Sequence, residues 1–254
     1  MKQHILFVAC AFMVQFSAFG QQNFFNVPSS DITPKKKLFF QQQANLTTQT
    51  VQFNTTFSYG LGKNTEIGIN FLGFTAGKDF FKKGFETSGD VENTPLFPFV
   101  MVNFAKAFPI TESFKLAAGT QFGVDISKKI DEINTGGYVY LNAVKYIEKT
   151  HTKLVLGLYG ATDDFVGTES RNFLNKNVAL SEVGIQSGIE QNIWDERLVF
   201  QADFISGKHN IGETVVGFAY YLTPKWVLSS GYQIPNKNSL SSKSIVFELT
   251  FSPK

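Results

Sequence analysis

The sequence has one cysteine, and its position removes thiol chemistry from consideration. Cys10 lies in an apolar run, residues 5–14, which follows a short basic start and precedes Ala18-Phe19-Gly20. This arrangement is typical of a secretory signal peptide, residues 1–20, cleaved after Gly20. A lipid anchor at Cys10 is disfavoured because only residues 5–9 separate it from the polar start. The exported chain would have no cysteine, which excludes a disulfide framework and a thiol nucleophile.

After this leader the sequence also lacks any apolar run of the about 20 residues that a membrane-spanning helix needs. The net charge is only +2, which gives no reason to expect nucleic acid as a partner. Phenylalanine, in contrast, is abundant, with 28 residues in a chain of mean hydropathy −0.05. So many apolar rings in a chain of average hydropathy require a large apolar surface built from alternating segments. A soluble sandwich and a membrane barrel both provide such a surface.

Alternation of apolar and polar residues recurs along the chain at intervals of about 10 to 20 residues, as in strands with two different faces. In residues 51–61, for example, Val51, Phe53 and Phe57 share one face while Gln52 and Asn54 share the other. About twelve strands are predicted in this way, at residues 38–44, 51–61, 67–71, 98–108, 114–126, 138–146, 154–158, 183–189, 198–204, 214–222, 226–234 and 245–251. Single-chain outer-membrane barrels likewise have an even number of strands.

The connections between these segments differ in length on the two sides. Short connections are predicted at residues 62–64, 109–113, 148–152, 194–197 and 223–225. Mostly longer ones alternate with them, at residues 75–95, 127–136, 163–177, 206–210 and 235–243. Short periplasmic turns and longer extracellular loops are the pattern of outer-membrane barrels, with both termini on the periplasmic side.

The polar face of the segments separates the barrel from the sandwich. A sandwich exposes this face to bulk water and favours Lys and Glu there, whereas here Gly, Gln, Asn and Ser predominate, as in the crowded lumen of a barrel. We therefore predict an all-β fold, a transmembrane antiparallel up-and-down barrel of residues 38–254, in the outer membrane of a bacterium and in contact with its lipid. Residues 21–37 are predicted as a periplasmic lead segment, and whether they enter the lumen is left open.

Two stretches resemble a known group of proteins. The C-terminal stretch VFQADFISGKHNIGETVVGFAYYLTPKWVLSSGYQIPN resembles bacterial outer-membrane barrel proteins described as transporters and related to the meta-pathway phenol-degradation family. The hairpin YGLGKNTEIGINF is similar to the early strands of those proteins. The resemblance implies an outer-membrane channel or transporter and leaves the solute open, and it brings no catalytic residues.

Enzymatic and metal-dependent functions are not expected. Past the leader the two histidines, His151 and His209, fall in predicted loops on opposite sides of the membrane, so they cannot share a metal ion. His209 and Ser206 form the one conceivable base and nucleophile pair, and it has no third group to orient it. The sequence predicts no enzyme activity, no metal and no cofactor.

Ionisable residues on the predicted inner face are the candidate functional residues, because charged groups facing a lumen set ion selectivity. They are Glu66, Asp125, Glu182, Glu190, Asp203, Glu248, Lys115 and Lys145. Either the carboxylates give a weak cation preference, or they pair with bases such as Lys115 and Lys145 and brace the wall. A predicted extracellular loop adds aromatic and basic residues, namely Phe80, Phe81, Lys82, Lys83 and Phe85.

The function that these features favour is passive passage of small solutes across the outer membrane. Eight strands leave an interior filled by side chains and sixteen or more leave an aqueous channel, so a barrel of about twelve strands is intermediate. The alternative is a non-conducting surface barrel whose extracellular loops bind a partner. The solute, the oligomeric state and whether the lumen is open or plugged are left open at this stage.

Overall fold

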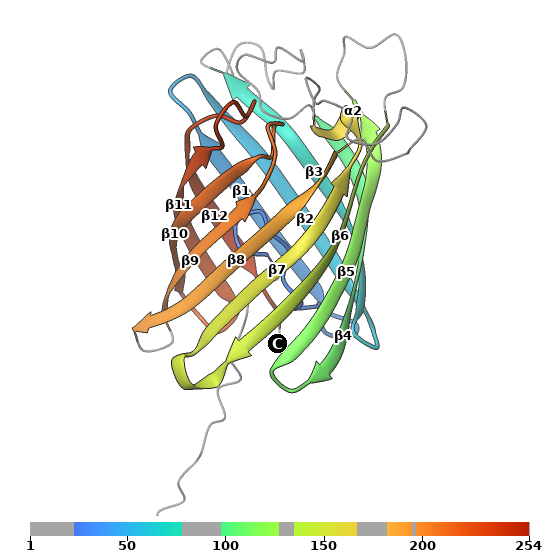
Figure 1. The fold of residues 1–254 in the computed structure, drawn as a ribbon, viewed down its shortest axis with the longest axis vertical. Coiled ribbons are helices and arrows are strands. Elements are labelled where there is room, and N and C mark those ends of the chain that lie inside the picture. Colours follow the sequence, from blue (N-terminus) through green and yellow to red (C-terminus); the bar gives the residue numbers. More distant parts are fainter. Residues whose placement is uncertain (1–22, 78–97, 127–134, 167–181, 195–196, 254) are drawn as a thin grey trace, which may run out of the picture.

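The computed structural model describes residues 23–77, 98–126, 135–166, 182–194 and 197–253. Within them twelve antiparallel strands close into a single barrel, in which each strand pairs with its neighbours in sequence and β1 pairs with β12 (Figure 1). The strands are β1 (Leu38–Leu46), β2 (Thr50–Gly62), β3 (Thr65–Gly77), β4 (Phe99–Thr111), β5 (Phe114–Asp125), β6 (Thr135–Ile147), β7 (Thr152–Ala161), β8 (Glu182–Trp194), β9 (Leu198–Ile205), β10 (Glu213–Tyr221), β11 (Trp226–Pro235) and β12 (Ser244–Phe251). The predicted up-and-down barrel is confirmed, and every predicted segment overlaps one strand.

The turn between β2 and β3 shows how the sequence sets the hairpins. Lys63 and Asn64 have φ values of 51° and 56°, and positive φ at both central residues of a two-residue turn matches the right-handed twist of the strands. The predicted corner at residues 62–64 therefore closes the hairpin as expected.

A bulge in β3 explains the largest difference between a predicted segment and its strand. Phe53 pairs with Phe74 and Thr55 with Phe71, so that two residues of β3 lie opposite the single residue between Phe53 and Thr55. One of the two is Gly73, whose φ is 74° and whose N–H donates to Asn54 Oδ1 at 2.9 Å. Because a bulge shifts the alternation by one residue, the pattern in the sequence stops at Phe71 although the strand continues to Gly77.

The outer face of the barrel is apolar and the inner face is mostly polar. Leu156, Phe122 and Leu158 point outward and are 64%, 58% and 57% exposed. On the inner face Gln186, Ser229 and Thr250 are completely buried. The outer face thus has the apolar character that contact with lipid requires, and closure leaves no unpaired strand edge in the barrel.

Two short helical turns accompany the strands. The 3₁₀ turn η1 (Glu148–Thr150) connects β6 to β7, and α2 (Asp163–Val166) follows β7 at the end where the longer connections lie (Figure 1). Among the described residues no helix combines the length and the apolar character that crossing a membrane requires.

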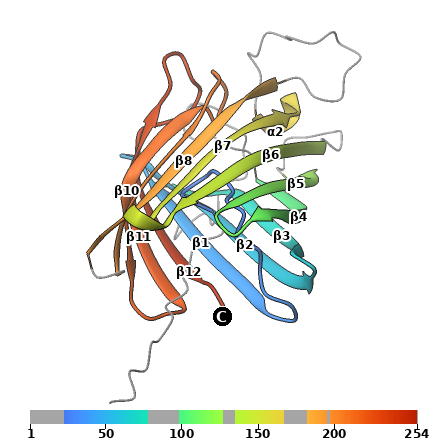
Figure 2. The same cartoon turned by 60° about the horizontal axis from the view of Figure 1, so that its bottom comes forward.

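The barrel is not empty. Residues 23–33, which we call the plug segment, lie inside it, while residues 34–37 are exposed and lead to β1 (Figure 2). Phe24, Phe25 and Val27 of the plug segment are at most 3% exposed, and the N–H of Phe24 donates to the carbonyl of Val27 in a tight turn. On the question whether the N-terminal segment, residues 21–37, enters the lumen, the structure places residues 23–33 within the barrel and leaves residues 34–37 exposed.

The assigned faces give a prediction about depth in the membrane. Replacing Leu156, in the middle of β7, with Arg should lower the free energy of unfolding by about 2–4 kcal/mol, because the charge would enter the lipid near the midplane. The matched change Ile193→Arg, also outward but at the end of β8, should cost about 0–1 kcal/mol. Urea unfolding of the protein refolded into phospholipid vesicles measures both, and equal costs would contradict the assigned depths in the membrane.

Candidate functional site

Two carboxylates of the barrel wall hold the tip of the plug segment. Asp203 Oδ2 accepts hydrogen bonds from the backbone N–H groups of Asn26 and Val27, at 2.6 and 2.9 Å. Glu213 Oε1 accepts from the side-chain amide of Asn26 at 2.8 Å. Bonds from N–H groups to a carboxylate are among the stronger hydrogen bonds in proteins, so these contacts fix the turn against β9 and β10.

A buried ionic cluster holds the other end of the plug segment. Lys153 Nζ lies 2.9 Å from Asp31 Oδ2 and 2.6 Å from Glu190 Oε2. Gln201 donates to the second oxygen of Glu190 at 2.8 Å, and the ring of Phe24 lies 5.1 Å from Lys153 Nζ. A buried charge is tolerated only when it is paired, so Lys153 ties the plug segment to β7 and β8.

Glycines in the wall make room for the two aromatic rings of the plug segment. A Cβ at Gly188 would lie 2.8 Å from the ring of Phe24, and a Cβ at Gly231 would lie 2.8 Å from the ring of Phe25. Any larger residue at these positions would therefore push the rings away. Phe24 and Val27 also pack with inward residues of β4, β6, β7 and β9, which makes one part of the lumen a solid apolar core.

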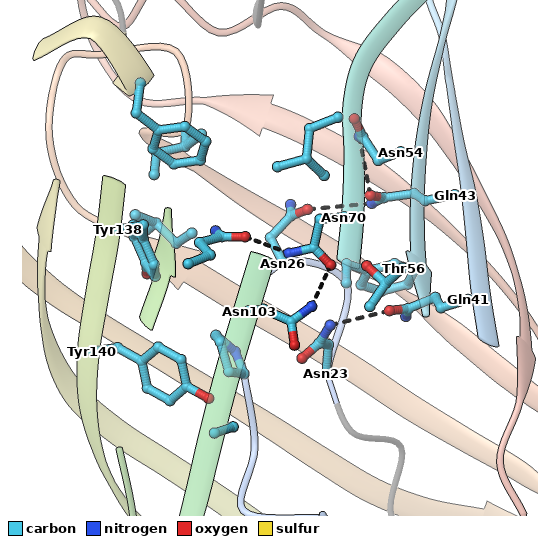
Figure 3. A pocket seen from close by; sticks show the side chains of 18 of the residues that line it. Asn23, Asn26, Gln41, Gln43, Asn54, Thr56, Asn70, Asn103, Tyr138 and Tyr140 are labelled. Carbon is cyan, nitrogen blue, oxygen red and sulfur yellow. Dashed lines mark hydrogen bonds between the residues drawn. The ribbon is translucent and has the colours of Figure 1, made fainter. Parts of the chain in front are cut away.

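The rest of the lumen contains a cavity of about 180 Å³ beside the plug segment (Figure 3). At about 30 Å³ for each water molecule, it holds on the order of six waters. Twelve amide side chains line it, namely Asn23, Asn26, Gln41, Gln43, Asn45, Gln52, Asn54, Asn70, Asn103, Gln121, Asn210 and Gln233. Two carboxylates, Glu66 and Glu213, also contribute, and no Lys, Arg or His is among the residues that line the cavity.

The amides around the cavity are joined in chains of hydrogen bonds. Asn103 donates to Asn70 at 2.7 Å, and Asn70 donates to Gln121 at 2.6 Å, which links β4, β3 and β5 (Figure 3). On the other side Gln43 of β1 donates to Asn26 of the plug segment at 3.3 Å. The cavity wall is therefore rich in amides, mixed with apolar side chains such as Leu72 and Ile211, and formed in part by the plug segment.

Most of the predicted lumen residues lie at inward positions. Glu66, Glu190, Asp203 and Glu248 are buried there, and Asp125, Glu182 and Lys115 occupy inward positions by strand register. Glu66 Oε2 accepts from the N–H of Thr33 at 2.7 Å, so a third carboxylate binds the plug segment. Their effect on ion selectivity stays a prediction.

Lys145 is a correction, because its side chain points outward. It pairs across the sheet with Phe114 and Leu154, both on the outer face, and its ammonium donates to Ser113 Oγ at 2.7 Å. The alternation in β6 places Val144 and Tyr146 inward, which leaves Lys145 on the lipid side near the end of the strand. Val144 is apolar although it points inward. The alternation in the sequence therefore assigned Val144 to the outer face and Lys145 to the lumen.

Lys153, Glu213 and the plug segment are functional residues that the sequence did not reveal. Lys153 and Glu213 each precede a predicted segment by one residue, so neither was assigned to a strand or to the inner face. Extending the alternation back by one residue would have placed both inward, beside Val155 and Val215. For the plug segment no signal exists, since residues 23–33 show neither a strand nor a helix pattern.

The loop from Ser206 to Gly212 packs a histidine into the outer end of the barrel. His209 is 1% exposed, and its Nε2 lies 2.6 Å from the hydroxyl of Tyr159, which itself donates to the carbonyl of Ser206 at 2.5 Å. Nε2 therefore carries the proton, and Nδ1 has no partner among the described residues. Burial lowers the pKa of His209 to about 4. The hydroxyl of Ser206 accepts from the N–H of Ile185 instead of approaching the imidazole.

Some of the predictions concern residues outside the described ranges. The signal peptide and the loop residues Phe80, Phe81, Lys82, Lys83 and Phe85 lie outside them. In the described part of the chain no three His, Cys, Asp or Glu side chains are grouped as a metal site.

A closed antiparallel barrel with an apolar outer face is the fold of bacterial outer-membrane β-barrels. No protein-family model matches the chain and no curated protein matches its sequence, so the link to the phenol-degradation family stays a prediction. Among solved structures the chain is similar to the NanC porin in a rhombohedral crystal form, with a TM-score of 0.50 and 10% identity over 86% of this chain and 100% of that one.

Two further outer-membrane barrels are similar at lower scores. They are the translocator domain of the autotransporter NalP from Neisseria meningitidis (TM-score 0.40, 11% identity, 84% of this chain and 86% of that one) and a FadL homologue from Pseudomonas aeruginosa (TM-score 0.36, 9% identity, 85% and 89%). At 10% identity the likeness to the porin concerns the fold alone.

The contact between Gly188 and Phe24 can be tested by adding one methyl group. Gly188→Ala should lower the free energy of unfolding by about 1–3 kcal/mol, because the Phe24 ring has no room to move within the core. Gly137→Ala is the matched control, since the nearest atom to its added Cβ would lie 3.6 Å away. Urea unfolding in detergent micelles compares the two, and a neutral Gly188→Ala would show that the plug segment does not pack there.

The buried histidine predicts a dependence of stability on pH. The folded pKa of His209, about 4, lies below its ordinary value of 6.5, so between these values the unfolded chain binds more protons. Stability should therefore fall as the pH drops from 6.5 to 4, by at most about 3 kcal/mol. The difference between the wild type and His209→Gln in unfolding at several pH values isolates this contribution, and a constant difference would refute it.

Proposed function

We propose that this barrel passes small solutes passively across the outer membrane, along the amide-lined cavity beside the plug segment. The observation that carries the proposal is the cavity itself, an amide-rich space inside a closed barrel whose outer face is apolar. Water and polar solutes cross hydrocarbon poorly, whereas a lumen lined by amides offers them hydrogen bonds in place of those they lose to water.

The plug segment limits what passes. It fills one part of the lumen together with inward residues of β4, β6, β7 and β9, and it leaves a space of about 180 Å³ on the other side. The expected solutes are therefore small. A wide aqueous channel, as in barrels of sixteen or more strands, is not what this lumen supports.

The inward carboxylates have a different role according to the state of the plug segment. While it is docked, Asp203 and Glu66 accept its backbone N–H groups and Glu190 neutralises Lys153. In this state the three carboxylates are engaged in hydrogen bonds or ion pairs that hold the plug segment. We propose that the weak cation preference predicted from the sequence develops when the plug segment leaves and these carboxylates face the lumen.

Conductance in planar lipid bilayers tests the proposal. Asp31→Asn removes the ion pair between the plug segment and Lys153, leaves at most a neutral acceptor in its place, and keeps Lys153 paired with Glu190. A hydrogen bond to a charged group contributes about 1.5–3 kcal/mol, so openings should become at least about tenfold more frequent. The control is Glu112→Gln, which removes an exposed carboxylate from the turn between β4 and β5.

Deletion of residues 23–33 is the second arm of this experiment. The deleted protein should conduct more than the wild type in KCl, and its reversal potential in a salt gradient should indicate cation preference. Silence from the wild type, Asp31→Asn and the deletion, all shown to be folded and inserted, would refute passage. The non-conducting surface barrel that binds a partner through its loops would then be the better explanation.

A further inference from the structure

We propose that the cavity beside the plug segment is a binding site for small, uncharged, hydroxyl-bearing molecules, of polyol or single-sugar size. The inference deepens the proposed function, because it names the class of solute that the passage would carry. It concerns equilibrium binding, however, so it is testable on protein that conducts nothing.

The chemistry of the wall points to hydroxyl groups. An amide side chain presents both donors and an acceptor, and a hydroxyl is the ligand group that satisfies both. A wall in which twelve amides line one small space therefore matches a molecule with several hydroxyls. Carboxylate or phosphate ligands, in contrast, are recognised by Arg and Lys, and neither lines this cavity.

Several of these amides have hydrogen-bonding capacity that the protein does not use. Gln41 and Gln52 each have a side-chain nitrogen without a partner among the described residues, and Asn45 and Asn210 each have such an oxygen. All four side chains are at least nine-tenths buried. A buried polar atom without a hydrogen bond costs free energy, and because all four residues line the cavity, rotation of these side chains toward a bound ligand would satisfy the two donors and two acceptors.

The charges around the cavity favour a neutral ligand. Its two carboxylates already accept hydrogen bonds, Glu66 from the N–H of Thr33 and Glu213 from Asn26 and the hydroxyl of Ser241. A cation would have to compete with these bonds, and an anion would meet carboxylates without a compensating base. A neutral molecule avoids both costs.

Aromatic rings and size complete the match. Tyr140 extends from β6 toward the amides, next to Tyr138, whose hydroxyl already donates to Gln186 (Figure 3). Gly119 leaves space for the Tyr140 ring, because a Cβ there would lie 2.5 Å from it. An amphipathic ring suits the carbon-bound hydrogens of a polyol, while the amides bind its hydroxyls. The volume of about 180 Å³ is below the roughly 300–1,000 Å³ of drug-sized sites, so the ligand is small.

A series of matched probes tests the site. Sorbitol, gluconate and glucamine share one carbon chain length and differ in the charge of one terminal group, neutral, negative or positive. Isothermal titration of the full chain, refolded in detergent micelles, should show sorbitol binding at least about tenfold more tightly than either charged probe, since one unpaired buried group costs about that factor. Equal binding of all three, or no binding of sorbitol, would overturn the proposal.

Substitutions in the wall locate the binding. Gln52→Leu should weaken sorbitol binding about tenfold, because it removes one amide from the cavity. Asn192→Leu is the control, an inward amide of β8 that does not line the cavity. Gln52→Glu should invert the preference toward glucamine, and this variant decides the matter if Gln52→Leu does not fold. Equal effects at Gln52 and Asn192 would refute the assigned site.

The outcomes for binding and for passage are separate. Sorbitol binding by a protein that is silent in bilayers would retain the site and refute passage. Conductance without sorbitol binding would retain passage and refute the site.

Discussion

The constraint on which the whole structure depends is that hydrocarbon offers no hydrogen bonds to a backbone. Every N–H and C=O within the membrane must find its partner inside the protein, and a sheet achieves this only by closing on itself. Here closure is made by β1 and β12, which pair antiparallel from Phe40 with Phe251 to Leu46 with Ile245. Once the ring is closed, the pleat assigns one side chain to lipid and the next to the lumen, and the two-faced composition follows.

Closure with twelve strands creates an interior that the wall does not fill by itself. The structure fills it in two ways, with rings and aliphatic groups on one side and with amides on the other. The plug segment belongs to both parts, since Phe24 and Val27 join the apolar core while Asn23 and Asn26 line the cavity. The buried carboxylates are needed at this boundary, because the turns of an irregular segment present N–H groups that no strand pairs.

The sequence predicts the wall well because alternation is a local property. Neighbouring residues in a strand point to opposite faces. The strands, and the inward positions of residues such as Glu190 and Asp203, can therefore be predicted from the alternation in the sequence alone. The same reasoning fails where an inward residue is apolar, as Val144 is beside Lys145. It also fails where a bulge shifts the alternation by one residue, as at Gly73. The plug segment lies beyond it altogether, because its partners Lys153, Asp203 and Glu213 are distant in sequence and no local pattern encodes such contacts.

The attachment of the plug segment just before β1 has a consequence for how the protein is assembled. Its contacts with Asp203 and Glu213 join residues 176 to 187 positions apart. Chain entropy opposes the closing of loops this long, so such contacts form late in folding. The first described residues of the chain thus reach their final place only when strands from its last quarter are present. Docking of the segment and completion of the ring become coupled events, and a chain truncated before β9 has no Asp203 or Glu213 to receive the tip of the plug segment.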